Sequence, residues 1–448
     1  MALFLVLGTV FGSGGCGDER AVVLDLSVHT SGDRLCVLAF GAGQGVFAQG
    51  YGGTDGPPPV TGTLAFLAGD TVSDSLRLTA RLAAGGAVVA GATGEAAFAD
   101  AGGSTLRLDV RRCQPRPRRL DAPTLRTLTR LDMLGTTPRL AAIDVDGDGR
   151  DELVGPASGG MLPRVDVSGV EATVTRVATD LANGEALRFL GDLDGDCALD
   201  AAALTRLGAR VALEAASGRV EGPALAPADA LDVAAGGFGP MGRAALVTAG
   251  PTGVIIVPWR GDAATSTLDA AAAVSVAVGD LSGDGRADLV ASGVAGAKVW
   301  LGSATGLTPA TGALPTGFTA VTGPIAIGDV DGEGTLDVVG AAADMILVAR
   351  NRGDGLLEDR TPAGLAPTAG PIAQLLVADL DGDCRDDVAT IDERGAVRVL
   401  LSIAPPALEP ATAMFPACAA FVAADVDGDG ARELVMLSLA GEVVLWGP

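Results

Sequence analysis

From residue 124 onward the chain alternates short apolar runs with polar, glycine-rich turns. The runs on the two sides of these turns read LAAI and LVG, VAVG and LVA, IAIG and VVG, and FVAA and LVM. Apolar runs this short and this rich in β-branched residues predict buried strands rather than helices. Each turn therefore joins two strands of a hairpin, and further apolar runs predict third strands in residues 253–259, 296–302, 396–401 and 441–447.

Six of the turns carry the same nine-residue acidic phrase. An acidic residue stands at positions 1, 5 and 9, an oxygen-bearing residue at position 3 and glycine at position 4. Ca²⁺ takes six to eight oxygen ligands, and alternate residues of a tight loop can point inward to supply them. An ordinary Asp-Gly hairpin turn needs no such repetition, so six copies in register predict calcium loops. The copies are DVDGDGRDE from Asp144, DLDGDCALD from Asp192, DLSGDGRAD from Asp280, DVDGEGTLD from Asp329, DLDGDCRDD from Asp379 and DVDGDGARE from Asp425.

These loops are not EF-hands. An EF-hand has helices on both sides and an acidic bidentate ligand at loop position 12. Strand-like runs flank the present loops, and no residue at position 12 carries a carboxylate. Position 12 is occupied by Gly155, Ala203, Ala291, Gly340, Thr390 and Met436.

The spacing of the loops predicts the architecture. Most successive loops start 46 to 50 residues apart, but the gap from Asp192 to Asp280 is 88 residues. Residues 233–247 in that gap align with residues 276–290 and keep the apolar runs without the carboxylates. Seven repeats of about 43 to 50 residues result, and this is the length of one four-stranded propeller blade. In the worn copy the ligand positions hold Gly237, Gly239, Met241 and Ala245.

The last repeat lacks a fourth strand after residues 441–447. Residues 124–134, just before the first repeat, are strand-like. We expect this segment to pair in the last blade and close the ring, because closure removes the exposed edges of an open array.

The acidic phrase with its strand flanks resembles the FG-GAP / VCBS repeat of integrin α-subunits and of many bacterial surface proteins. The segment NRGDGLLEDR (351–360) also resembles the glycine-rich turn of that repeat. The resemblance covers about residues 124 to 448. It implies an all-β fold, a seven-bladed β-propeller preceded here by a small β-sandwich-like domain, with Ca²⁺ loops between the first two strands of a blade.

The resemblance also implies the ligands of about six Ca²⁺ ions. Ser282 replaces a carboxylate, so we expect a weaker site there, and Cys197 and Cys384 replace the usual glycine at position 6. The implied ligands are Asp144, Asp146, Asp148 and Glu152; Asp192, Asp194, Asp196 and Asp200; Asp280, Ser282, Asp284 and Asp288; Asp329, Asp331, Glu333 and Asp337; Asp379, Asp381, Asp383 and Asp387; and Asp425, Asp427, Asp429 and Glu433.

Charge and the N-terminus concern partners and compartment. The formal net charge is −24, and the ligand positions hold nearly as many carboxylates; such an acidic chain is a poor nucleic-acid binder.

Residues 2–11 form an apolar run of signal-peptide length, followed by SGGC. This resembles a bacterial lipoprotein signal with Cys16 as the lipidated residue, and plain secretion is the alternative. We expect an extracytoplasmic protein, either an outer-membrane lipoprotein or a secreted or periplasmic one.

Six cysteines suit an oxidising compartment. Cys36 and Cys113 both belong to the region before the repeats, so we expect a disulfide between them. Cys384 and Cys418 are candidates for a second disulfide, and Cys197 is then left over if Cys16 is lipidated.

The region before the repeats reads as a separate unit. Short alternating segments between Gly, Asp and Pro turns predict a small all-β domain, with no family resemblance. We therefore divide the chain into a signal segment (1–20), a small all-β domain (21–113), a Pro- and Arg-rich linker (114–123) and the propeller (124–448).

Catalytic chemistry has little support. The only histidine, His29, lies in the small domain, which leaves Ser-His-Asp and Cys-His catalysis on the repeats without its usual base. Carboxylate-pair chemistry stays open, but the loops account for the clustered carboxylates, so we expect no enzyme. Trp259, Trp300 and Trp446 occupy equivalent third-strand positions, where they either pack between blades or serve a lectin site.

The first functional hypothesis is a calcium-stabilised module for binding or adhesion at the cell surface. It would bind a protein or glycan on the face opposite the metal loops and reach the membrane through a lipid at Cys16. This rests on analogy of fold, which does not fix function. The alternatives are a structural scaffold of an envelope assembly and a Ca²⁺-dependent polysaccharide-active enzyme.

Overall fold

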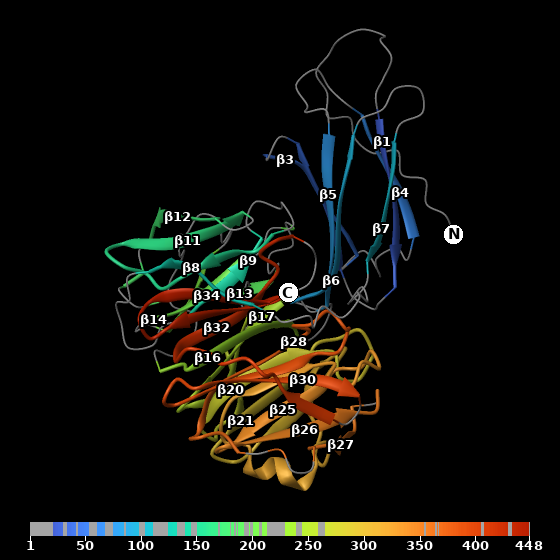
Figure 1. Cartoon of the computed structure of the whole chain (residues 1–448). Coiled ribbons are helices and arrows are strands. Elements are labelled where there is room, and N and C mark those ends of the chain that lie inside the picture. The colour runs from blue at the N-terminus through green and yellow to red at the C-terminus, as the bar shows by residue number, and fades with distance from the viewer. Residues whose placement is uncertain are drawn as a thin grey trace.

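The chain is all-β apart from one short 3-10 helix, η4 (Thr316–Ala320), among the residues described (Figure 1). No helix in that part of the chain is long and apolar enough to cross a membrane. The computed structural model describes residues 21–29, 34–41, 44–52, 61–67, 75–84, 87–97, 104–110, 124–131, 139–144, 150–168, 171–179, 181–182, 185, 187–191, 197, 200–205, 208–212, 229–238, 244–258, 265–353, 355–362, 365, 367–404, 407–428 and 432–447.

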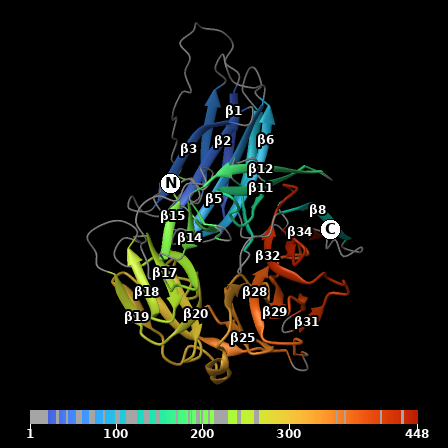
Figure 2. The same ribbon diagram turned by 90° about the vertical axis from the view of Figure 1, so that its left-hand side faces the viewer.

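Two sheets form the region before the repeats, and they share one apolar core. The core joins Leu24 of β1 (Ala21–Val28) and Leu108 of β7 (Ser104–Val110) in one sheet to Val37 of β2 (Arg34–Gly41) and Leu78 of β5 (Ser75–Ala84) in the other. Both views place these sheets at one end of the remaining sheets (Figures 1 and 2). One sheet has the order β4 (Thr61–Leu67), β1 (Ala21–Val28), β7 (Ser104–Val110); the other has the order β3 (Gln44–Gly52), β2 (Arg34–Gly41), β5 (Ser75–Ala84), β6 (Ala87–Ala97).

The repeats form consecutive antiparallel sheets, most with four strands in simple sequence order, as expected for propeller-like blades. The predicted hairpins and third strands are confirmed. The sheets are β9 (Ala141–Ile143), β10 (Glu152–Val154), β11 (Met161–Ser168), β12 (Glu171–Ala178); β13 (Leu187–Gly191), β14 (Asp200–Thr205), β15 (Gly208–Ala212); β16 (Asp232–Gly237), β17 (Ala244–Gly250), β18 (Gly253–Pro258), β19 (Ser266–Asp269); β20 (Ala273–Gly279), β21 (Asp288–Gly293), β22 (Lys298–Ser303), β23 (Gly306–Pro309); β24 (Ile325–Gly328), β25 (Asp337–Ala342), β26 (Met345–Asn351), β27 (Leu357–Asp359); β28 (Ile372–Ala378), β29 (Asp387–Asp392), β30 (Val397–Ala404), β31 (Ala407–Pro410); and β32 (Cys418–Ala424), β33 (Glu433–Ser438), β34 (Glu442–Gly447) with β8 (Thr124–Arg130).

The last sheet is completed by a strand from before the first repeat. β8 pairs antiparallel with β34, with Leu125 opposite Trp446 and Arg126 opposite Leu445. The predicted pairing of residues 124–134 with the last repeat is therefore confirmed for residues 124–130. The first and last sheets also share a core, in which Leu153 and Val435 both lie fully buried.

The worn repeat keeps its strands without its ligands. β16 and β17 pair over the expected hairpin, with Gly237 opposite Ala244. Ala245 is buried in β17, whereas Gly239 and Met241 lie outside the described residues.

The tryptophans favour packing over a sugar site. Trp300 is 3% exposed, and it packs with Val247 of the preceding sheet and with Val276 of its own sheet. Trp446 is 2% exposed and meets Phe415 edge-on, with ring centroids 5.5 Å apart. Trp259 lies outside the described residues.

The predicted Cys36–Cys113 disulfide is wrong. Cys36 is bonded to Cys197, with the two Cα atoms 5.6 Å apart, so Cys197 is not the leftover cysteine. Cys36 of β2 lies opposite Arg81 of β5, and Arg81 in turn binds Asp144 of the first repeat. This part of the sheet therefore faces the repeats, which proximity along the chain does not reveal. Cys113 and Cys16 lie outside the described residues.

The predicted Cys384–Cys418 disulfide is also wrong. Cys418 is a buried free thiol that lies at the start of β32, and burial raises its pKa to about 12. Gln374, near the start of β28, donates to the carbonyl of Ala419 at 2.8 Å. The starts of β28 and β32 are therefore adjacent. Cys418 lies at the start of β32, whereas Cys384 follows the end of β28, so the length of a strand separates the two cysteines. Cys384 is itself disulfide-bonded, whereas Cys418 is free.

Candidate metal centre

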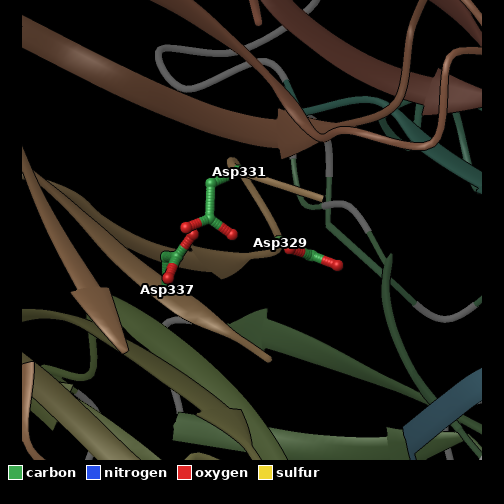
Figure 3. A group of neighbouring side chains, drawn as sticks. All are labelled: Asp329, Asp331 and Asp337. Carbon is green, nitrogen blue, oxygen red and sulfur yellow. The ribbon is translucent and has the colours of Figure 1, made fainter. Parts of the chain in front are cut away.

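Among the residues that the structure describes, three of the acidic loops bring their carboxylates together. In each, the side chains at positions 1, 3 and 9 offer oxygens that all lie within 4.8 Å of one another. In the loop between β24 and β25, the carboxylates of Asp331 and Asp337 point toward one another, with Asp329 beside them (Figure 3). The groups are Asp329, Asp331 and Asp337; Asp379, Asp381 and Asp387; and Asp425, Asp427 and Glu433.

Backbone hydrogen bonds fix the carboxylate at position 9, which begins the second strand. One oxygen of Asp337 accepts from the N–H of Val330 at 3.0 Å, and the other accepts from Asn351 of the third strand at 2.8 Å. Asp387 repeats the pattern with Leu380 and Ser402, at 3.0 and 2.7 Å. The carboxylate is thus held between the loop and the third strand before any ion arrives.

The carboxylate at position 1 folds the loop around itself. Asp379 accepts from the N–H groups of Gly382 and Cys384 at 2.8 and 2.9 Å. Asp280 accepts equivalently from Gly283 and Gly285, at 2.7 and 2.8 Å. A carboxylate at position 1 therefore orders the loop backbone as well as offering an oxygen.

Cysteine adopts the glycine conformation at position 6. Gly285 and Gly334 have φ of 79° and 86° there, and Cys197 and Cys384 have φ of 72° and 68°. Left-handed φ is unfavourable for a residue with a Cβ, yet both cysteines adopt it.

Crowding of the carboxylates is unfavourable without a cation. Burial, together with the neighbouring charges of Asp331 and Asp329, raises the pKa of Asp337 to about 7. Burial likewise raises the pKa of Asp387 well above its ordinary value, with a contribution from Asp381. Buried like charges favour protonation or a bound cation. Oxygen ligands about 2.4 Å from a Ca²⁺ ion lie up to about 4.8 Å apart, so these groups fit the ion.

The family comparison agrees with this geometry. A model of the FG-GAP-like repeat matches residues 280–340 and 329–390. Residues 280–390 are FG-GAP-like repeats. The matched segments begin at position 1 of the loops at Asp280 and Asp329, and the second ends three residues after Asp387. No curated protein matches the sequence.

Solved structures that resemble the chain share little sequence with it. One is a lectin from Agrocybe aegerita that specifically recognises non-reducing terminal N-acetylglucosamine; it is 18% identical, covers 70% of this chain and 86% of its own, and has a TM-score of 0.47. Another is BBS1N in complex with ARL6DN, soaked with mercury; it is 13% identical, covers 72% of this chain and 93% of its own, and has a TM-score of 0.42.

Within the FG-GAP-like repeats, the loop at Asp280 is the incomplete one. Its four predicted ligands are all described, but it is not among the carboxylate groups found in that part of the chain. Ser282 stands at position 3, and its buried Oγ has no hydrogen-bond partner among the described residues. Burial raises the pKa of Asp288 to about 6. Weaker calcium binding at this loop stays a prediction.

The remaining predicted ligands are described only in part. Asp144, Glu152 and Asp200 are described, as are Glu333 and Asp383 of the FG-GAP-like repeats. Asp146, Asp148, Asp192, Asp194, Asp196 and Asp429 lie outside the described residues.

The sequence did not reveal which cations approach the loops. Arg81 of the small domain donates to Asp144 at 2.8 Å, and the two side chains are only 13% and 11% exposed. Arg164 pairs with Glu152 of the same loop at 3.0 Å. Arg350 of β26 pairs with both Asp331 and Glu333. No spacing rule in the sequence connects these arginines to the loops.

The sequence also missed bridges between neighbouring loops. Asp386, at position 8 of one FG-GAP-like loop, accepts from the N–H of Asp329 at 2.6 Å and donates its own N–H to the Asp329 carbonyl at 2.8 Å. Asp151 makes the same two contacts with Asp425, at 2.9 and 2.7 Å. An acidic residue at position 8 is the signal that could have shown this.

Proposed function

We propose that the protein is a calcium-binding, seven-bladed β-propeller that binds a macromolecule outside the cytoplasm. The observation that carries the proposal is the gathering of three carboxylates within 4.8 Å in each of three loops. Raised carboxyl pKa values in the same loops indicate sites built for a cation. Asp329, Asp331 and Asp337, with Glu333 at position 5, would hold one ion, and Asp379, Asp381, Asp383 and Asp387 another.

Packing around the repeats supports a closed ring. The core shared by the first and last sheets and the Asp151–Asp425 contacts join the two ends of the array. The worn repeat supplies β16 to β19 between its neighbours, which supports a count of seven blades. Calcium in such a ring stabilises it, since an ion that binds only the folded form shifts the equilibrium toward it.

The partner and location extend the proposal beyond the calcium loops. A lipid on Cys16 would anchor the propeller at a bacterial outer membrane, and the propeller would serve as an adhesion module for a protein or glycan. Extracellular calcium modules typically bind with Kd of about 10⁻⁴ to 10⁻³ M, so such sites fill outside the cell and not in cytosol. Replacement of Cys16 by alanine should abolish incorporation of a labelled fatty acid, and unchanged labelling would refute the anchor.

Metal analysis tests the calcium proposal directly. After dialysis against millimolar Ca²⁺, the protein should retain about six ions, and at least the three complete groups should be filled. Two or fewer ions would refute the assignment. EDTA should lower the melting temperature, and an unchanged melting curve would show that calcium has no structural role.

A screen against envelope proteins and glycans, with and without Ca²⁺, separates the candidate roles. Binding to a defined partner supports the adhesion module. A constitutive complex with envelope proteins that survives EDTA favours the structural scaffold, and cleavage of an acidic polysaccharide favours the enzyme.

A further inference from the structure

A cavity lies directly beside the metal loop between β24 and β25. Its volume is about 150 Å³, and residues of both the sheet β24–β27 and the sheet β28–β31 line it. Val330, Asp331 and Asp337 of the loop line it together with Leu408 of β31. The space is smaller than the roughly 300–1,000 Å³ of a drug-sized pocket, so it admits one small chemical group.

Two guanidinium groups line the same cavity. Arg350 of β26 pairs with Asp331 and Glu333 of the metal loop. Arg360 pairs with Glu358 at 3.0 Å, and its side chain is 46% exposed. A guanidinium presents several N–H donors in a planar fork that matches a carboxylate. The cavity thus offers cationic donors beside the apolar side chains of Val330, Val348 and Leu408.

Calcium would change the state of Arg350. Asp331 and Glu333 are both predicted Ca²⁺ ligands, so an ion in the loop takes up the oxygens that Arg350 holds in its absence. The ion also cancels half of the charge of the four loop carboxylates. The guanidinium of Arg350, whose side chain is 28% exposed, then loses these two acceptors. A ligand in the cavity can supply a new one.

We propose that this cavity binds a carboxylate-bearing ligand when Ca²⁺ occupies the loop, with Arg350 as the principal contact. The inference rests on the proposed calcium binding and adds to it the class of ligand and the place where it binds. It puts a ligand beside the metal loops rather than on the opposite face. The carboxylate would come from a sugar acid or from an acidic amino acid, and apolar contacts with Val330 and Leu408 would hold the rest of the group.

Calorimetric titration with four small molecules tests the proposal. Glucuronate and N-acetylglutamate carry the carboxylate, whereas glucose and N-acetylglutamine are their uncharged counterparts. In saturating Ca²⁺, at least one acid should bind at least tenfold more tightly than its counterpart, and the one that does identifies the source. In EDTA the affinity should fall at least tenfold. Absence of binding by both acids, or equal binding in EDTA, would overturn the proposal.

Two variants and a matched control make the test specific. Arg350→Gln should weaken acid binding at least tenfold, and Ala407→Phe, at the exposed rim of the cavity, should block it. Arg352→Gln should bind as the wild type does, because Arg352 pairs with Glu358 at 3.5 Å and is not among the cavity-lining residues. Unchanged acid binding by Arg350→Gln would refute the role of Arg350.

A separate calcium titration of each protein distinguishes the two kinds of failure. If the wild type binds no Ca²⁺, the proposed function fails. If it binds Ca²⁺ but neither acid, only the cavity assignment fails. Arg350→Gln should keep the wild-type number of ions, because the glutamine removes a competitor for Asp331 and no ligand.

Discussion

Removal of the Cys36–Cys197 disulfide should destabilise the protein by several kcal/mol. The bond joins residues 161 positions apart, and a cross-link over that distance restricts the unfolded chain strongly. The chain-entropy relation gives about 5 kcal/mol at 25 °C for such a loop, and measured disulfides typically contribute about 2–4 kcal/mol. We therefore expect the double variant Cys36→Ala/Cys197→Ala to lose about 3–5 kcal/mol of unfolding free energy.

Alanine is the appropriate replacement because both cysteines are buried. Cys36 is 5% exposed and Cys197 is 3% exposed, and Leu38 packs with them in a small cluster. A serine hydroxyl left without a partner there would add its own cost of about 1–3 kcal/mol. Alanine isolates the effect of the cross-link from that of a buried polar group.

The assay is denaturant-induced unfolding at constant Ca²⁺ under non-reducing conditions, followed by tryptophan fluorescence and by circular dichroism. Cys418→Ala is the matched control, since it removes a buried thiol that forms no disulfide. Without the covalent link the small domain can unfold separately, so the two probes should give separate transitions. A loss below about 1 kcal/mol, or one no larger than that of Cys418→Ala, would refute the reasoning.

Three further predictions concern the loops. Arg81→Gln removes the cation that pairs with Asp144, whose side chain is only 11% exposed, and breaking a buried ion pair typically costs about 3–5 kcal/mol. The loss, measured by chemical unfolding, should be larger in EDTA than in Ca²⁺, and an equal loss would contradict a calcium site there. In the calcium-free protein the pKa of Asp337 is about 7, compared with an ordinary value of 3.8. The stability that its proton confers is therefore complete below about pH 4 and lost as the pH rises through 7; the increase in melting temperature on adding Ca²⁺ should grow from pH 5 to pH 8, and a constant increase would count against this. In Gly328→Ala the new Cβ would clash with Cγ1 of Val377 and lie 2.7 Å from Oδ2 of Asp386, the oxygen that binds the Asp329 N–H. Calorimetry should show weakened Ca²⁺ binding at this loop, and a wild-type isotherm would show that the bridge is dispensable.

Local patterns predicted most of the repeat structure. The apolar runs and their spacing gave the strands on either side of Asp329 and Asp379, because a hairpin is fixed by neighbouring residues. The worn copy at Gly237 was found for the same reason, since its apolar runs survive the loss of its ligands.

Contacts between distant segments were beyond the sequence. The sequence favours a bond from Cys36 to the next cysteine in the chain, Cys113. The true partner is Cys197, which lies in a repeat. Arg81 and Arg350 carry no motif, and only the folded sheets bring them to Asp144 and Asp331. Such contacts depend on how sheets face one another, which periodicity within a strand does not encode.

The pairing of β8 with β34 has a consequence for how the chain folds. Arg126 and Leu445 are neighbours in one sheet although about 300 residues separate them in the sequence. Native contacts between distant segments slow folding, because the entropy of closing a long loop is lost before any contact compensates for it. During synthesis β8 emerges long before β34, so it cannot form its native pairing until β34 has been synthesised. An exposed strand edge of this kind recruits other chains, so we expect the interval before β34 appears to be the period in which this protein is most prone to aggregate.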